Sequence, residues 1–132
     1  GFVTAIDHVG LAVRDLDQAI AFYQDAFGMQ LVHEEVNEEQ GVREAMMAVG
    51  DSGSCIQLLA PLKDDSPIGK FLSRNGEGIQ QVAYRVSDID VAADEVVHGG
   101  TRAAIGDQGR LEPGRGGEEQ AGHVRGRADA AM

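Results

Sequence analysis

The stretch Ile6–Asp17 (IDHVGLAVRDLD) decides the fold, because the chain repeats it in altered form as Ile79–Asp90 (IQQVAYRVSDID). One Ile, two Val and the last two Asp of the stretch recur in register, so each copy predicts a strand that runs into a capped helix. His8 and Gln81 occupy equivalent positions in the two copies. The repeat therefore predicts two copies of one structural module.

The size and charge of the chain limit its partners. Its 132 residues are enough for one domain with an ordinary core. The formal net charge of -11 argues against nucleic acid and anionic membrane surfaces, since both need clustered Lys and Arg. No stretch of the sequence is long and apolar enough to span a membrane, and its first residues do not have the charged-then-apolar pattern expected of a leader. The single cysteine, Cys55, excludes a disulfide framework and predicts a cytoplasmic location.

The first copy has two unequal faces. Residues 5–13 alternate as a strand, which places His8 on one face and Val9, Leu11 and Val13 on the other. The second face is the more apolar and should contact a helix. His8 should therefore point away from that helix.

A helix with clear boundaries follows this strand. Asp15 and Gln18 have the spacing of an N-terminal capping box, and Gly28 ends the apolar helical pattern. Three further strands are predicted, at residues 29–36, 42–49 and 54–59. The first module is therefore strand-helix-strand-strand-strand, with its helix on one face of the sheet.

The second module begins after a short linking helix that Ser66-Pro67 should start. A strand at 79–86 and a helix capped by Asp88 repeat the first module, and a further strand is expected at 101–105. The repeat then fails.

Residues 106–132 are rich in glycine and charge and contain few large apolar side chains. Such a segment cannot bury enough surface to offset its ordering entropy, so we expect coil or disorder there. The second module is thus expected to be incomplete at its C-terminal end. A diverged tail and a lost reading frame are two explanations for the break in composition.

Four polar residues lie in otherwise apolar strands and are candidates for chemistry: His8, Glu44, Gln57 and Gln81. A polar side chain in an apolar run needs a partner, and an imidazole with amide and carboxylate oxygens could bind a metal ion. Ordinary structural roles compete with this interpretation. The His could be hydrogen-bonded, the Gln residues satisfied by backbone or solvent, and Glu44 exposed and paired with Arg43 or a cross-strand Lys.

Several segments resemble the methylmalonyl-CoA epimerases, a family of the vicinal-oxygen-chelate (glyoxalase-like) superfamily. These segments are Ile6–Val9, Phe22–Tyr23, Glu38–Met46, Gln57–Pro61, Asn75–Ile79 and Ala83–Val86. The resemblance implies an α+β fold of paired βαβββ modules that form a cupped sheet. On this basis residues 1–132 form one domain, with module one at 4–61, a linker helix at 62–77, module two at 78–105 and a low-apolar tail at 106–132.

The resemblance also implies an activity and a site. The activity would be the interconversion of (R)- and (S)-methylmalonyl-CoA through a metal-stabilised enolate, with an acyl-CoA thioester as substrate. The family's metal ligands fall on His8, Gln57 and Gln81, and one of its two catalytic bases falls on Glu44. The cofactor would be one divalent metal ion, with Co, Mn, Zn and Mg not distinguished.

Two departures from the family pattern matter. Gln80-Gln81 replaces a His-His pair, which exchanges a nitrogen donor for an amide oxygen and favours harder cations. The family's last-strand Glu, its fourth ligand and second base, is not visible. Counting on from Gln57 by an offset of 72, one less than between the two copies because one residue is lost at the glycine turn, reaches Asp129, which lies outside any strand pattern. Glu118 and Glu119 are no better placed. We therefore expect weak metal binding and poor epimerisation.

Other functions on the same fold compete with an epimerase. One is a metal-free module that binds small molecules, and another is a glyoxalase-like metal enzyme. A ring-cleaving dioxygenase needs two His ligands and fits less well, and a scaffold role is the simplest alternative. An incomplete second module leaves sheet edges open, so we expect a homodimer.

Overall fold

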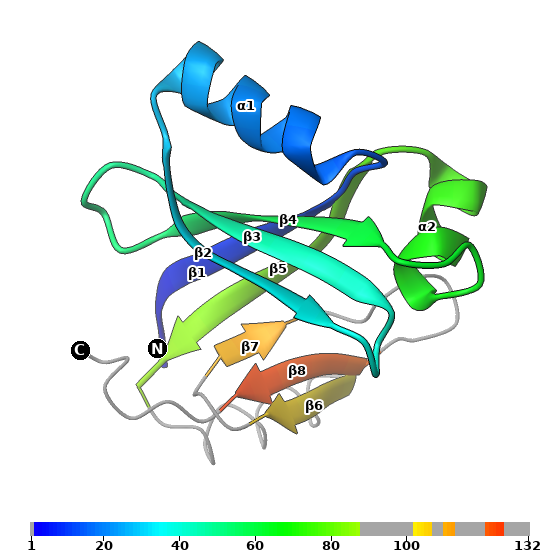
Figure 1. Ribbon diagram of the computed structural model, residues 1–132. Helices are drawn as coiled ribbons and strands as arrows, with labels where there is room; N and C mark the ends of the chain where they lie inside the picture. The colour runs from blue at the N-terminus through cyan, green and yellow to red at the C-terminus, as the bar shows by residue number, and fades with distance from the viewer. Residues whose placement is uncertain (1, 88–101, 107–109, 113–120, 126–132) are drawn as a thin grey trace. The chain divides into compact units, whose positions relative to one another are not determined.

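Strand pairing and helix caps organise the structure, a computed structural model that describes residues 2–87, 102–106, 110–112 and 121–125 (Figure 1). Its contacts divide the chain into two compact units. The first unit is residues 9–80, and the second unit is residues 1–8 with 81–132. The strand β1 (Val3–Ala12) contributes its last four residues to the first unit and its first six to the second.

The sheet of the first unit has the strand order β2-β3-β4-β1. Its three complete strands are β2 (Gln30–Asn37), β3 (Val42–Ala48) and β4 (Cys55–Pro61). Both β2 and β4 pair with β3 antiparallel. These strands confirm the predicted positions to within two residues at each end.

The helix α1 (Leu16–Phe27) has the caps that its sequence predicts. A carboxylate oxygen of Asp15 accepts a hydrogen bond from the backbone N–H of Gln18 at 3.0 Å. Gly28 takes the left-handed conformation (φ 69°), and its N–H donates to the carbonyl of Gln24. The two caps satisfy backbone groups at both ends and so define the length of the helix.

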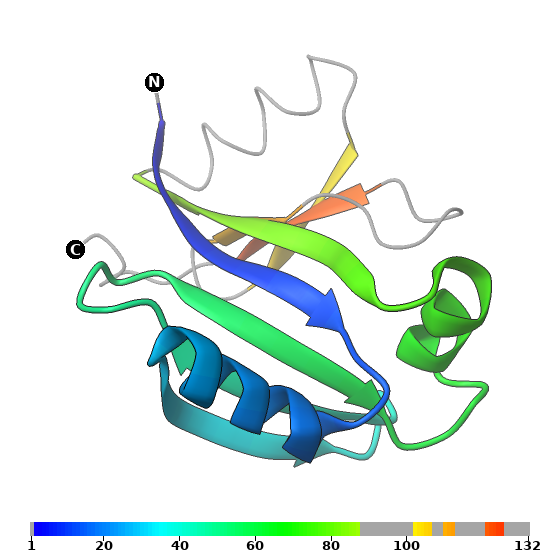
Figure 2. The same ribbon diagram turned by 90° about the horizontal axis from the view of Figure 1, so that it is seen from above.

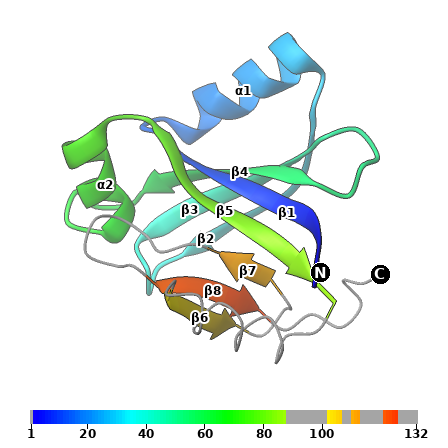
Figure 3. The ribbon, with the colours of Figure 1, turned by 180° about the vertical axis from the view of Figure 1, so that it is seen from behind.

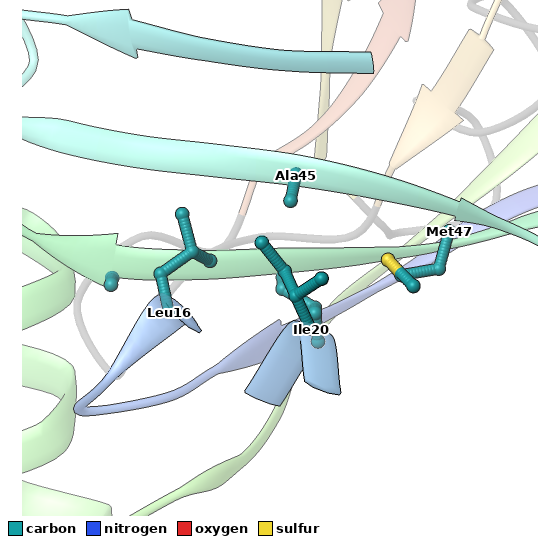
Figure 4. Close-up of a cluster of buried hydrophobic side chains, with 6 residues drawn as sticks. Leu16, Ile20, Ala45 and Met47 are labelled. Carbon is teal, nitrogen blue, oxygen red and sulfur yellow. The ribbon is translucent and has the colours of Figure 1, made fainter. Parts of the chain in front are cut away.

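The helix α1 packs over one face of β3 and β4, and the main core of the first unit lies between them (Figures 2 and 4). Its buried residues are Leu16, Ile20, Ala45, Met47, Leu58 and Ala60. Leu11 and Val13 also pack against this cluster, which confirms that the more apolar face of the first strand contacts the helix.

A second cluster involves α2 (Pro67–Asn75), the predicted linking helix. The Ser66 hydroxyl accepts from the N–H of Gly69 at 3.1 Å and caps the helix. A side chain at Gly69 would collide with the backbone carbonyl of Asp64, so only glycine fits there. Ile68 and Leu72 are the helix residues of this cluster.

In the second unit β1 neighbours β5 (Gly78–Val86), and β5 neighbours β7 (Arg110–Glu112). The order continues with β8 (Ala121–Arg125) and ends with β6 (Arg102–Gly106), which runs parallel to β8. The expected strand at 101–105 is therefore confirmed as β6. The expectation of coil throughout 106–132 is wrong at β7 and β8, because backbone pairing needs few large apolar side chains.

The second unit also departs from the repeat in its strand order. In the first unit the last strand, β4, neighbours β1, whereas in the second unit β7 and not β8 neighbours β5. The helix expected after Asp88 lies outside the described residues. Among the helices that the structure describes, none is long and apolar enough to cross a membrane.

The main core allows a direct test of packing. Leu58 is fully buried beneath α1, whereas Leu62 is 40% exposed just beyond β4. Leu58→Ala should lower the free energy of unfolding by about 2–5 kcal/mol, because it leaves a cavity. Chemical denaturation of the matched Leu62→Ala variant should show a loss below about 1 kcal/mol. Equal losses in the two variants would contradict this assignment of the core.

Candidate active site

His8 is held by its neighbour in the chain. Its side chain is 4% exposed, and its Nδ1 lies 2.8 Å from Oδ2 of Asp7, which is 3% exposed. A carboxylate only accepts hydrogen bonds, so Nδ1 carries the proton and donates it to Asp7. In the neutral imidazole this assigns the lone pair to Nε2, a buried atom. That is the tautomer in which an imidazole can bind a metal through Nε2.

Arg85 holds the other oxygen of the same carboxylate. Its Nε and Nη2 donate to Oδ1 of Asp7 at 3.2 and 2.6 Å. The guanidinium remains charged and compensates the buried carboxylate, which would otherwise be costly. Asp7 therefore joins Arg85 to His8, one oxygen to each.

The strands β1 and β5, which carry His8 and Gln81, are neighbours in the sheet (Figure 3). The N–H of Ser87 donates to the carbonyl of Phe2 at 2.9 Å, and the hydroxyl of Thr4 donates to the carbonyl of Arg85 at 3.1 Å. From the first contact to the second, the residue on the β1 side advances from Phe2 to Thr4 while its partner goes back from Ser87 to Arg85. The two strands are therefore antiparallel, and these contacts define their register. Continued along the strands, this register pairs His8 with Gln81 on one face. Gln81 is also buried, and its Oε1 is a buried atom.

Glu44 and Gln57 meet in the first unit. The side-chain amide of Gln57, on β4, donates to Oε1 of Glu44, on β3, at 3.2 Å. Met46 lies directly opposite Gln57 and Leu59 opposite Glu44, so the bond runs diagonally between the strands. Alternation directs both side chains to the face away from α1, since Ala45 on β3 packs against that helix.

Two of the ordinary explanations for these residues are wrong in detail. Arg43 does not pair with Glu44 but donates to carboxylates of Asp17 and Glu34 at 3.4 and 3.2 Å. Gln57 directs its amide to a side chain and not only to backbone or solvent. Glu44 and Gln57 thus form a defined polar pair that joins β3 to β4.

The sequence did not reveal the roles of Asp7 and Arg85. Neighbouring strand residues point to opposite faces, so strand alternation argues against a contact between Asp7 and His8. Arg85 lies on a distant strand and could be recognised only from the β1–β5 register. A buried acid next to a candidate ligand was the one available signal.

The donor atoms fit a cation of intermediate or hard character. Among the described residues no three His, Cys, Asp or Glu side chains cluster closely enough to hold a metal, so amide oxygens would have to contribute. His8 offers an imidazole nitrogen, and Gln57 and Gln81 offer amide oxygens. Asp129, Glu118 and Glu119 lie outside the described residues, and the last strand, β8, contains no acid.

Residues 7–118 match the family profile described as Glyoxalase/Bleomycin resistance protein/Dioxygenase superfamily. The ethylmalonyl-CoA/methylmalonyl-CoA epimerase of Cereibacter sphaeroides is 34% identical over 98 residues, which cover 74% of this chain and 72% of that protein. The chain belongs to this superfamily, in its methylmalonyl-CoA epimerase family. The expected α+β, glyoxalase-like fold class is thereby confirmed.

Solved structures of epimerases agree with this family assignment. The methylmalonyl-CoA epimerase of Mycobacterium tuberculosis is 44% identical, with a TM-score of 0.76 over 95% of this chain and 89% of that one. A methylmalonyl-CoA epimerase in complex with methylmalonyl-CoA and NH4+ is 36% identical, with a TM-score of 0.76 over 96% of both chains. The chain spans about half the length of the mitochondrial epimerases that it matches, for example 49% of the human protein.

The Glu44–Gln57 pair predicts a measurable coupling energy. In a double-mutant cycle, Glu44→Ala and Gln57→Ala should be non-additive by about 1–2 kcal/mol, because each removes the same charge-assisted hydrogen bond. Denaturant titration of the wild type, the two single variants and the double variant gives the four unfolding free energies that the cycle compares. Glu34→Ala is the control partner, since Glu34 contacts Arg43 and its effect should add to that of Gln57→Ala. Additivity in both cycles would show that the Glu44–Gln57 bond contributes nothing.

Proposed function

We propose that the chain is a methylmalonyl-CoA epimerase with His8, Gln57 and Gln81 as ligands of one divalent metal ion and Glu44 as one catalytic base. The observation that carries the proposal is the hydrogen bond between Gln57 and Glu44. This hydrogen bond joins Gln57, a metal ligand by the family resemblance, to Glu44, a catalytic base by the same resemblance. The buried His8 and Gln81, paired across β1 and β5, supply the other two ligands.

Glu44 would move the proton. The hydrogen at C2 of methylmalonyl-CoA lies between a thioester and a carboxylate and is weakly acidic. A carboxylate can remove it from one face and return it, as a general base and then a general acid. The amide of Gln57 holds Oε1 of Glu44 and so restricts the position of the carboxylate.

Each proposed ligand has a donor atom that the hydrogen bonds of its own unit assign. His8 would bind through Nε2, because its Nδ1–H donates to Asp7. Gln57 uses its amide nitrogen on Glu44, so its Oε1 is the ligand atom. Gln81 would bind through Oε1. When bound, a divalent ion supplies positive charge that stabilises the negative charge developing on the substrate oxygens.

The substrate class is supported by the relatives. One related epimerase was solved with methylmalonyl-CoA, and the Streptomyces coelicolor enzyme was solved with 2-nitronate-propionyl-CoA. We propose an acyl-CoA thioester as the substrate of this chain and a homodimer as its assembly. The cytoplasmic location and the division into modules remain predictions. The proposal does not distinguish Co, Mn, Zn and Mg as the metal.

The role of Glu44 can be tested by isotope exchange. In deuterated buffer, Glu44→Gln should slow exchange at C2 of methylmalonyl-CoA by about 10²–10⁴-fold, because the amide keeps its oxygen for Gln57 but cannot accept the proton. Proton NMR of the substrate gives the rate. The control is Glu34→Gln, which changes an acid on the opposite face of the sheet from Glu44. This variant should exchange the C2 hydrogen of the substrate at the wild-type rate. Unchanged exchange in Glu44→Gln would remove Glu44 from the mechanism.

The stereochemical outcome tests whether a second base takes part. Inversion needs an acid on the far face of the substrate, and β8 has none. We expect the wild-type chain to exchange the C2 hydrogen faster than it inverts the centre. Chiral analysis of the recovered thioester, run beside the exchange measurement, distinguishes the two rates. Inversion as fast as exchange would contradict a one-base site.

The metal ligands can be tested by binding of Co²⁺ alone. His8→Ala should weaken Co²⁺ binding by more than about 100-fold, since loss of a ligand exceeds the roughly 10–100-fold effect of losing its outer partner. Isothermal titration calorimetry of chelator-treated protein measures the affinity. His33→Ala is the matched control, because His33 is 56% exposed and pairs with Glu35. Equal affinity in the wild type and His8→Ala would favour the metal-free binding module.

A further inference from the structure

We infer that Asp7 and Arg85 are positioning residues that fix the tautomer and orientation of His8. This inference rests on the proposed function, since a metal ligand is what His8 would be prepared for. Neither residue would contact the metal or the substrate. Both would act through the imidazole ring.

The first step is the division of the Asp7 carboxylate between two partners. Oδ2 accepts from Nδ1 of His8 at 2.8 Å, and Oδ1 accepts from both Nε and Nη2 of Arg85. A carboxylate held at both oxygens cannot rotate without breaking a charge-assisted hydrogen bond. The Nδ1–H of His8 therefore meets an acceptor in a fixed position.

The second step is the absence of competition from bulk water. His8 and Asp7 are both buried, and Arg85 is 23% exposed. The chain contains a useful contrast on β2, where Nε2 of His33 lies 2.6 Å from Oε1 of Glu35 and both side chains are about half exposed. Water can replace either partner of that surface pair. It has little access to the buried pair, so the buried hydrogen bond should determine the tautomer of its histidine.

The third step is the choice of arginine. Nε and Nη2 of Arg85 belong to one rigid planar group and both donate to Oδ1 of Asp7. A lysine ammonium is a single point of charge and does not offer two donors in this fixed geometry. The carbonyl of Arg85 also accepts from Thr4, so its backbone is fixed to β1. The pairing of β1 with β5 thus fixes the position of Arg85, Arg85 fixes the carboxylate of Asp7, and this carboxylate orients the ring of His8.

The test reads the tautomer directly and without metal. Nitrogen-15 NMR of the imidazoles in the metal-free protein should show His8 protonated at Nδ1, with its signal identified by its loss in His8→Asn. Asp7→Asn and Arg85→Lys should each shift His8 toward a mixture of tautomers. The matched controls, Asp17→Asn and Arg43→Lys, alter a surface ion pair of the first unit and should leave the His8 signal unchanged.

Co²⁺ affinity provides the second readout. Asp7→Asn should weaken binding by about 10–100-fold, the range typical of the outer partner of a ligating histidine. Arg85→Lys should weaken it by a smaller factor, and it keeps the inference testable if the buried Asp7→Asn substitution prevents folding. Circular dichroism and thermal unfolding confirm that each variant is folded.

The two readouts separate this inference from the proposed function. An Nδ1-protonated His8 in the wild type that becomes mixed in Asp7→Asn or Arg85→Lys supports positioning. A folded variant with an unchanged tautomer, or a wild-type His8 protonated at Nε2, overturns it even if Co²⁺ binds. A wild type with the expected tautomer and no Co²⁺ binding supports positioning and overturns the metal site.

Discussion

The alternation of side chains along β3 and β4 is the constraint on which the first unit depends. On one face Ala45, Met47 and Leu58 meet α1, and on the other Gln57 reaches Glu44. Because the period is two, a slip of one residue would move the acid beneath the helix and the apolar residues to the opposite face. The same strand register is thus required both to pack the core beneath α1 and to place Glu44 on the opposite face.

Much of the first unit could be predicted because its signals are local. The caps Asp15 and Gly28 bound α1, and alternation located the strands. The same reasoning found buried polar residues, because His8, Gln57 and Gln81 interrupt apolar strands and are buried in the structure. A polar group in such a place must be satisfied, and this requirement is visible in sequence even when the partner is not.

Features that depend on pairing between distant segments could not be predicted. The link from Arg85 through Asp7 to His8 requires the register of β1 on β5, and sequence adjacency argued against it. The strands β7 and β8 were missed for a different reason. Their composition measures how much surface they can bury, whereas their formation depends on backbone hydrogen bonds to neighbouring strands. The order in which they pair is likewise not encoded in the repeat.

The edge strand β2 has a consequence for how the protein behaves in concentrated solution. It is exposed almost throughout, and its apolar residues include Leu31, Val32 and Val36. The register shift between Leu31 and His33 makes Val32 an extra residue, so the edge is bent and not a straight template for another strand. The bulge at Val32 therefore opposes edge-to-edge pairing of β2 through a side chain that is 57% exposed and lies outside the core beneath α1.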